Sequence, residues 1–338
     1  MVDREADQGG AVFAQAAKNA SLQARSVYPD AMRRIVVAAD VDSSLEDAAR
    51  GDARFEIVRR PVRTEYELAA IVGDAEILVT RAYNKVTRRV LDAAPRLELI
   101  VQGTSGIDNV DLDAAKARGI TVINMPGINA NAVAELVIGF MISMTRTVPF
   151  YTRAIVRGTF DRDDCATRHE LRHFRLGIIG LGQVGARVAR LAAAFGMPVT
   201  AYDPYIGANE MPRAQSLDEL LAASDILTLH VPLTEETRRM IGVAEIAKLA
   251  RGSYLVNASR GEVLDQQAAL AALANDHLAG LALDVFDPEP PIAPLPDDPR
   301  LILTPHVGGC SYEVKTTAGA RVFDKIAAFF RRSAADSP

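Results

Sequence analysis

Short apolar runs alternate with segments of helical spacing from residue 34 to residue 146. The runs are rich in Ile, Val and Leu, whereas the segments between them repeat apolar residues with the period of a helix. Runs of this kind indicate strands buried on both faces, which belong to a parallel sheet covered by helices on both sides. We expect strands at 34–39, 55–60, 76–80, 97–102 and 121–125, and helices at 64–74, 88–94, 111–119 and 131–146.

A second series of the same kind begins at Arg175, after a charged and less regular stretch at 157–174. It predicts a further doubly wound sheet, so the chain is expected to hold two α/β domains, each binding ligands beyond the carboxyl ends of its strands. An amphipathic helix at 311–332 follows. Strands are expected at 175–180, 198–203, 225–232, 253–259, 278–285 and 301–306, and helices after the first strand and at 216–224, 243–250 and 266–275.

The length agrees with two domains, because 338 residues exceed what one packed core usually holds. Residues 1–33 are expected to be an extension, either frayed or with one short helix at 12–24. The opening residues do not have the pattern of a signal peptide. The apolar stretch 132–145 contains Glu135 and is shorter than the ~20 residues of a membrane span, so we expect a buried helix.

Composition narrows the function classes. Asp and Glu total 43 against 38 Lys and Arg, which disfavours a nucleic-acid partner. The 2 cysteines, Cys165 and Cys310, form neither a disulfide framework nor a CxxC pair, so a cytoplasmic protein is expected. The His, Asp and Glu residues show no metal-ligand spacing, and Cys310 is expected to be inert.

The most informative motif is a glycine turn between a strand and a helix. Gly180 permits a tight turn, Gly182 lets the backbone approach a pyrophosphate, and Gly185 lets the helix pack against the strand. Unpaired N–H groups at the helix N-terminus favour phosphate binding. Asp203 follows the next strand and can accept hydrogen bonds from ribose hydroxyls, which predicts NAD rather than NADP. The alternative is a glycine-rich turn without a ligand.

Further charged residues follow later strands of the same series. Arg260, Asp284, Glu289 and His306 fall where a doubly wound fold places its ligand. Hydride transfer on a 2-hydroxy acid needs a base for the hydroxyl proton, which a histidine supplies, and a paired carboxylate stabilises the imidazolium. A guanidinium can bind the substrate carboxylate and polarise the carbonyl.

These motifs resemble the NAD-dependent D-2-hydroxyacid dehydrogenase family, which includes D-3-phosphoglycerate dehydrogenase. The resemblance covers residues 34–325 and rests on GLGQVG, HVPLTEETR, NASRGEVLD, LDVFDPEP and TPHVGG, with GTSGIDNVDL and NMPGINANAVAE in the first half. It implies an oxidoreductase acting on CH–OH donors. It also implies a Rossmann nucleotide domain at 131–310, inserted in a flavodoxin-like substrate domain formed by 34–130 and 311–338.

The resemblance also implies a role for each motif residue. Arg260 would bind and polarise the substrate, and His306 would donate a proton in reduction and accept one in oxidation, with Glu289 as its partner. Asp284 would orient the nicotinamide carboxamide. The implied cofactor-binding residues are Gly180, Gly182, Gln183, Val184, Gly185, Asp203, His230, Pro232, Thr237, Ala258, Ser259, Arg260, Asp284 and His306, and the implied substrate-binding residues are Arg81, Ser105, Gly106, Asn129 and Arg260.

Some of these residues have a plainer interpretation. His230 is either a packing residue or an adenine contact, Arg81 is either a solvated loop residue or a phosphate ligand, and Asp284 is either a ligand or a strand cap. The chain contains no tryptophan, unlike many relatives before the glycine turn. It ends at Pro338 without the C-terminal regulatory domain of long phosphoglycerate dehydrogenases, so serine feedback is not expected. Glu289 argues against formate, because formate dehydrogenases carry glutamine there.

The expected substrate is a small 2-hydroxy or 2-keto acid. 3-Phosphoglycerate is one candidate, supported mainly by Arg81, and reduction of hydroxypyruvate or glyoxylate is the alternative. A different class, an NAD-sensing co-repressor-like binding protein, also shares the family fold. The long helix that begins near Asn131 is expected to bury more apolar surface than one domain can cover. Together with the family resemblance, this predicts a homodimer built on the nucleotide domains. No membrane partner is expected.

Overall fold

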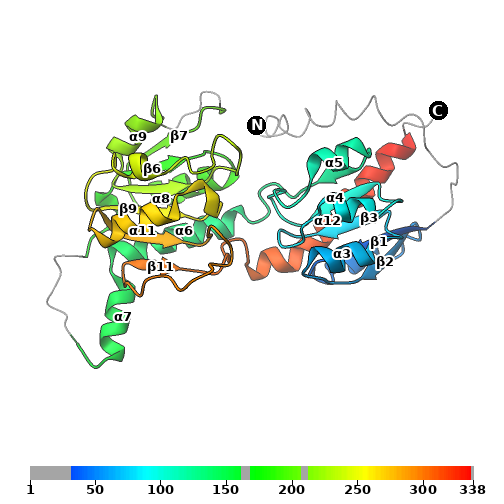
Figure 1. Ribbon diagram of the computed structural model, residues 1–338, viewed down its shortest axis with the longest axis horizontal. Helices are drawn as coiled ribbons and strands as arrows, with labels where there is room; N and C mark the ends of the chain where they lie inside the picture. The colour runs from blue at the N-terminus through cyan, green and yellow to red at the C-terminus, as the bar shows by residue number, and fades with distance from the viewer. Residues whose placement is uncertain (1–31, 161–167, 207–211, 336–338) are drawn as a thin grey trace. The chain divides into compact units, whose positions relative to one another are not determined.

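The computed structural model describes residues 32–160, 168–206 and 212–335. Residues 1–31 of the predicted extension and Cys165 lie outside this range, and Arg33, expected to end the extension, is the first residue of β1. The chain forms two compact units. The continuous unit is Gly127–Val314, and the discontinuous unit lies within Met1–Pro126 and Lys315–Pro338. Each unit is a parallel sheet flanked by helices (Figure 1), which confirms the predicted fold class of two doubly wound domains.

The discontinuous unit holds a five-stranded parallel sheet in the order β2-β1-β3-β4-β5, the flavodoxin-like order. Its strands pack apolar residues on both faces, as the uninterrupted apolar runs predict. The strands are β1 (Arg33–Val37), β2 (Phe55–Arg59), β3 (Ile77–Thr80), β4 (Leu99–Gln102) and β5 (Thr121–Ile123), and the helices are α2 (Ser44–Ala49), α3 (Glu65–Ile71), α4 (Arg88–Asp92), α5 (Leu112–Ala117) and most of α12 (Tyr312–Ala335).

Two sets of helices cover this sheet. Leu68 of α3, Leu91 of α4 and Ala114 of α5 pack in one cluster with alternate strand residues. On α12, Val322 and Ile326 are fully buried, as the amphipathic pattern predicts, and Phe323 and Phe330 of the same helix contact Phe55. Helix α12 therefore completes the core of the discontinuous unit.

The continuous unit holds a six-stranded parallel sheet in the order β11-β10-β9-β8-β6-β7. Beside β7, Ala201 and Arg213 form an isolated parallel bridge. If this bridge is counted as a minimal strand at the third position, the strand order is that of a Rossmann fold. The strands are β6 (Leu176–Ile179), β7 (Val199–Tyr202), β8 (Ile226–Leu229), β9 (Ser253–Asn257), β10 (Leu278–Leu283) and β11 (Leu301–Leu303), and the helices are α6 (Ala130–Thr145), α7 (Val148–Val156), α8 (Gln183–Ala194), α9 (Leu217–Ala223), α10 (Val243–Ile246) and α11 (Gln266–Ala274), with short 3-10 turns η2 (Leu171–His173) and η3 (Gly261–Val263).

Successive strand residues face opposite sides of this sheet, as the pleat requires. Ile178 packs with α6 and α8, whereas Ile179 packs with the layer of α9, α10 and α11. The predicted buried helix is α6, which buries Val137, Met141 and other residues of the stretch 132–145. Helix α7 was not predicted, and none of its residues is buried.

None of the described helices is both long and apolar enough on its own to cross a bilayer. Helices α6 and α7 together meet the length and composition criteria, but they are bent by 63° at the break between them.

Candidate active site

The candidate residues of the continuous unit gather at one edge of its sheet. Because all strands of the sheet are parallel, their carboxyl ends lie along the same edge. Each motif residue follows a different strand, and the topology brings together segments far apart in the sequence. The residues are Gly180 after β6, Asp203 after β7, His230 after β8, Arg260 after β9, Asp284 after β10 and His306 after β11.

The glycine turn has the geometry that its three glycines predict. Gly180 has a φ of +88°, and a Cβ there would lie 2.7 Å from the carbonyl oxygen of His230. A Cβ on Gly185 would lie 2.1 Å from the carbonyl oxygen of Gly180, so only glycine allows this helix-to-strand contact. Gly182 is the N-cap of α8, and a Cβ there would meet nothing within 4 Å. The space over Gly182 fits an approaching phosphate group.

Asp203 is fixed beside this turn by two backbone donors. Its carboxylate accepts hydrogen bonds from the N–H of Leu181, at 2.8 Å, and from the N–H of Tyr205, at 3.0 Å. The carboxylate is therefore attached to the middle of the glycine turn. This position suits a ribose held next to a pyrophosphate.

Gln183 and Val184 open helix α8. The Gln183 side chain accepts a hydrogen bond from Arg187, at 2.8 Å, and lies so close to Gly127 that a Cβ there would be 3.1 Å from its Oε1. Asn129 lies at the N-cap of α6, where its amide nitrogen would be 2.5 Å from a Cβ on Gly309. The backbone after His306 therefore runs against Asn129.

His230 follows β8 and is partly buried. Its Nε2 lies 3.0 Å from the Thr228 hydroxyl, and its Nδ1 is buried without a hydrogen-bond partner among the described residues. Burial lowers the pKa of His230 to about 3, so the ring is neutral at ordinary pH. In the following loop, the Thr237 hydroxyl donates to the carbonyl of Pro232 at 2.6 Å. These contacts stabilise a loop adjoining the glycine turn, and an adenine contact by His230 stays a prediction.

The segment Ala258–Arg260 is held by Asn257, the last residue of β9. The Asn257 amide donates to the Arg260 carbonyl at 2.9 Å and accepts from the Ser259 hydroxyl at 2.8 Å. The guanidinium of Arg260 donates to the Ser259 carbonyl at 2.8 Å. Sequence analysis missed Asn257, although an amide at a buried strand end is a signal for such a turn.

Gly261 brings the arginine segment close to the acidic segment. A Cβ on Gly261 would lie 1.8 Å from the carbonyl oxygen of Phe286, so this approach of two backbones requires glycine. Glu289 lies three residues beyond Phe286. The charge of Arg260 acts on both Glu289 and His306, so the three charged groups predicted from the sequence form one electrostatic cluster.

His306 and Glu289 are directly paired. The imidazole Nδ1 lies 2.6 Å from the Oε1 of Glu289, and both side chains are partly exposed. The hydrogen bond to Glu289 raises the pKa of His306, against an opposing effect of burial. Burial raises the pKa of Glu289, but the hydrogen bond and charge of His306 outweigh it, and the net shift is downward. Both directions favour an ion pair between imidazolium and carboxylate.

Asp284 is buried next to this pair. Its carboxylate accepts hydrogen bonds from the Thr304 hydroxyl and from the N–H groups of Val307 and Gly308. All three donors belong to the segment that carries His306. These bonds do not test the predicted contact of Asp284 with a carboxamide. They show that the carboxylate binds the segment around His306.

The remaining substrate candidates belong to the discontinuous unit. Arg81 follows β3, and its guanidinium donates to the carbonyl of Asp40 at 3.2 Å. Ser105 follows β4, and its hydroxyl donates to the carbonyl of Met125 at 3.0 Å. The carbonyl of Gly106 accepts from the Thr104 hydroxyl at 3.3 Å. These residues lie past the carboxyl ends of their strands, and their substrate contacts stay predictions.

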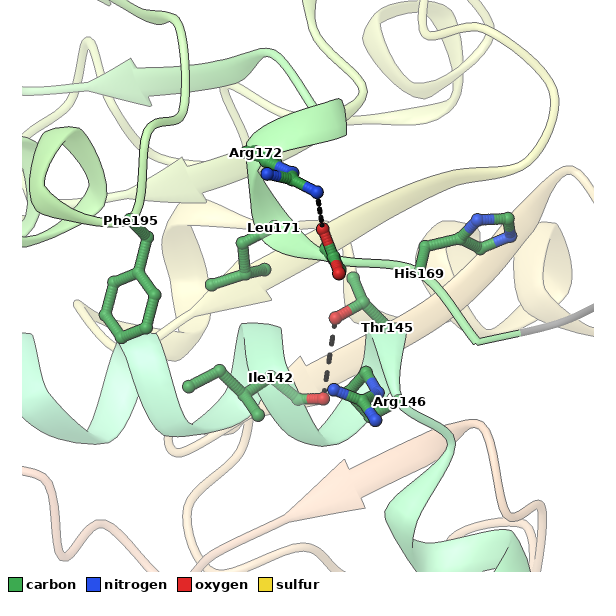
Figure 2. A pocket seen from close by; sticks show the side chains of 8 residues that line it. Ile142, Thr145, Arg146, His169, Leu171, Arg172 and Phe195 are labelled. Carbon is green, nitrogen blue, oxygen red and sulfur yellow. Dashed lines mark hydrogen bonds and ion pairs between the residues drawn. The ribbon is translucent and has the colours of Figure 1, made fainter. Parts of the chain in front are cut away.

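The continuous unit also contains a pocket of about 320 Å³ with a different set of residues (Figure 2). It is formed around the end of α6 and the turn η2, and none of Arg260, Glu289 and His306 lines it. It is therefore not the site of the predicted chemistry. The lining residues are Ile142, Thr145, Arg146, His169, Glu170, Leu171, Arg172 and Phe195.

Comparisons with known proteins agree with this geometry. Residues 138–308 match the family described as D-isomer specific 2-hydroxyacid dehydrogenase, NAD binding domain. A D-3-phosphoglycerate dehydrogenase of Methanocaldococcus jannaschii is 38% identical over 81% of this chain and 53% of its own length. The chain thus spans about half of that relative. A hydroxypyruvate reductase of Thermotoga maritima is 36% identical over 77% of this chain and 86% of its own length.

A solved structure gives the same result for the fold. The D-lactate dehydrogenase of Aquifex aeolicus, complexed with NAD and lactic acid, superimposes with a TM-score of 0.77 at 28% identity, covering 88% of this chain and 96% of that one. Since the match covers most of both chains, it includes both sheets. The chain therefore belongs to the D-isomer specific 2-hydroxyacid dehydrogenase family, with its NAD-binding domain in the continuous unit.

Proposed function

We propose that the protein is an NAD-dependent oxidoreductase that interconverts a small D-2-hydroxy acid and its 2-keto acid. The observation that carries the proposal is the 2.6 Å contact between His306 Nδ1 and Glu289 Oε1. This pair lies at the same sheet edge as the glycine turn and as Arg260. A histidine paired in this way is suited to move one proton per reaction.

The residues of the glycine turn fit NAD. The backbone at Gly182 is open to a pyrophosphate, and the N-terminus of α8 supplies N–H donors. The Asp203 carboxylate would accept from the ribose hydroxyls and repel a 2′-phosphate. NAD, when bound, supplies the hydride acceptor in oxidation and the hydride donor in reduction.

His306 would carry the proton. Because Nδ1 contacts Glu289, Nε2 is the nitrogen that can exchange a proton with the substrate oxygen. In oxidation, neutral His306 takes the hydroxyl proton, and the Glu289 carboxylate stabilises the imidazolium that forms. In reduction, the imidazolium returns a proton to the carbonyl oxygen.

Arg260 would bind the substrate carboxylate and polarise the carbonyl. A guanidinium offers several donors in one plane, which suits a carboxylate next to a carbonyl. The segment that carries it is fixed by Asn257 and by the close approach of Gly261 to Phe286. The chain therefore holds this side chain on a rigid turn after β9, as catalytic positioning requires.

We propose that the substrate carries a second anionic or polar group, which residues of the discontinuous unit would bind. Ser105 and Gly106 would offer backbone groups to the substrate carboxylate, and Arg81 a cation for a phosphate. Asn129 of the continuous unit would add a polar contact. Arg81 supports 3-phosphoglycerate as the substrate, which agrees with the name of the relative from M. jannaschii. The name of the relative from T. maritima supports hydroxypyruvate instead. Glyoxylate belongs with the second alternative.

The direct test is NADH oxidation by the purified full chain against a panel of 2-keto acids, with and without a phosphate group. Turnover of at least one member, abolished in His306→Asn, is the expected result. A protein that binds NADH tightly and reduces none of them would contradict the proposal and would favour the NAD-sensing binding role instead.

We also propose that the protein acts as a homodimer in the cytoplasm. Helix α7 extends away from the sheet of the continuous unit (Figure 1), and it exposes Val148, Phe150, Ile155 and Val156. A helix that exposes several large apolar side chains is typical of an interface, and a second copy of this chain is the proposed partner. Light scattering should give twice the mass of one chain, and Phe150→Asp should lower it to one.

A further inference from the structure

The backbone at His306 is unusual. Its φ is +54°, in the left-handed region that residues other than glycine seldom occupy. Such a conformation persists only where surrounding contacts hold it, and conformations of this kind concentrate at functional sites. The side chain of His306 is also the one that contacts Glu289. The contacts that hold this backbone therefore also decide where the imidazole lies.

Three of those contacts come from Asp284, in addition to backbone hydrogen bonds such as that from the His306 N–H to the Thr304 carbonyl. The Asp284 side chain is 2% exposed, and both carboxylate oxygens accept hydrogen bonds from the segment 304–308. Oδ1 accepts from the Thr304 hydroxyl at 2.6 Å and from the Val307 N–H at 2.8 Å, and Oδ2 accepts from the Gly308 N–H at 2.8 Å. The donors lie on both sides of His306, so the carboxylate fixes the chain before and after it. Hydrogen bonds to a charged acceptor are among the strongest in proteins.

The close approach of Gly308 supports the same conclusion. A Cβ at Gly308 would lie 2.7 Å from the Oδ2 of Asp284, which is shorter than side-chain contacts allow. The glycine therefore lets the carboxylate reach the backbone. A carboxylate has about four acceptor sites, and three are used here, which leaves one for any ligand.

We propose that Asp284 is a positioning residue that clamps the segment 304–308 and thereby holds the His306 imidazole on Glu289. This role rests on the proposed function for its catalytic meaning and goes beyond the predicted contact with a carboxamide. The charge of Asp284 also acts in the same direction as that of Glu289 on His306, whereas Arg260 and burial act against them. Two carboxylates that both follow β10 thus favour the imidazolium.

Substitutions can separate the effect of the Asp284 charge on His306 from the effect of the position of the segment 304–308. Asp284→Asn removes the charge and turns one acceptor into a donor that faces the Gly308 N–H. Gly308→Ala and Thr304→Val keep the charge but disturb the clamp, the first by contact with Oδ2 and the second by loss of one donor. Thr304→Ser keeps the hydroxyl and should rescue. Val285→Ala is the matched control, because it removes buried volume next to Asp284 without touching its hydrogen bonds.

The first readout is the NMR titration of His306 in the cofactor-free protein. The chain has 5 histidines, and His306→Asn assigns the signal. We expect the pKa of His306 to fall in Asp284→Asn, Gly308→Ala and Thr304→Val, and to stay at the wild-type value in Thr304→Ser and Val285→Ala. Unchanged titration in both Gly308→Ala and Thr304→Val would overturn the clamp.

The second readout is steady-state kinetics. A displaced histidine should lower kcat by about 10- to 100-fold in Gly308→Ala and less in Thr304→Val, with KM for NADH unchanged, since small displacements of a reacting group cost rates of this order. A carboxamide role alone predicts the reverse, a raised KM for NADH in Asp284→Asn and no effect in Thr304→Val, and would also overturn the proposal. If the wild type reduces no 2-keto acid, the proposed function fails, and the NMR titration still decides the clamp.

Discussion

The candidate residues at the carboxyl edges of the two sheets are held by different kinds of contact. At the edge of the continuous unit, side chains from separate strands contact one another, as Glu289 does with His306 and Asp284 with Thr304. In the discontinuous unit, Arg81 and Ser105 instead donate to main-chain carbonyls of their own unit. The first edge therefore holds the paired side chains of the proposed proton carrier within one unit, and the candidate residues of the second edge are fixed on main-chain carbonyls.

This difference implies a division of work. Substitutions of Glu289 or His306 in the continuous unit should change the rate of the chemical step for every substrate, because the proposed proton carrier is formed there. Substitutions at Arg81 or Ser105 should change which substrate is bound. Catalysis depends on groups that interact more strongly in the transition state, whereas uniform binding changes KM alone.

The largest effect is expected at the proton carrier. His306→Asn removes the imidazole that contacts Glu289, and kcat should fall by about 100- to 10,000-fold for all substrates, the usual range for general acid–base catalysis. His277→Asn is the matched control, because His277 Nε2 contacts the Ile246 carbonyl of the same unit. Equal activity of the two variants would contradict the division of work. Steady-state NADH oxidation measures both.

The second-largest effect is a difference in stability between substitutions at two glycines of the continuous unit, Gly261 and Gly182. Gly261→Ala places a Cβ 1.8 Å from the Phe286 carbonyl, so the free energy of unfolding should fall by at least about 1–3 kcal/mol, as for other overpacked sites. Gly182→Ala meets nothing within 4 Å and should leave stability nearly unchanged while weakening NADH binding. Urea unfolding and fluorescence titration test the pair. A stable, active Gly261→Ala would show that the approach of the two backbones is not required.

The smallest effect is expected in the discontinuous unit. Arg81→Ala should raise KM for a phosphorylated substrate by about 10- to 100-fold, the worth of a hydrogen bond to a charged group, and leave kcat and the KM for glyoxylate nearly unchanged. Arg96→Ala, which removes a surface ion pair with Glu76, is the control. Equal effects of Arg81→Ala on both substrates would remove the phosphate assignment.

The sheets were predictable because their central strands, such as β3, β4, β6, β8 and β9, are buried on both faces. The apolar runs at 34–39 and 175–180 contain the strands β1 and β6, apart from Arg33. The predicted strand 225–232 is too long, since β8 ends at Leu229 and the apolar residues after it belong to the loop beside the glycine turn. Helix α7 was missed because it buries no side chain, and burial is what gives a helix its apolar period.

The site was predictable as residue types but not as contacts. His306, Glu289 and Arg260 were recognisable because each follows a strand end in a specific motif. The left-handed backbone of His306 and the three bonds to Asp284 depend on how two strand ends meet, which spacing along the chain does not contain. Gly261 and Asn257 were passed over for the same reason.

The central claim is tested most directly by the pH dependence of kcat/KM for 2-keto acid reduction in wild type and Glu289→Gln. Reduction needs protonated His306, so activity falls as pH rises through the pKa of that residue, which Glu289 holds above its ordinary value of 6.5. Glutamine removes the charge, so the pKa of His306 falls and the falling limb moves to lower pH. Superimposable limbs in the two proteins would contradict the account.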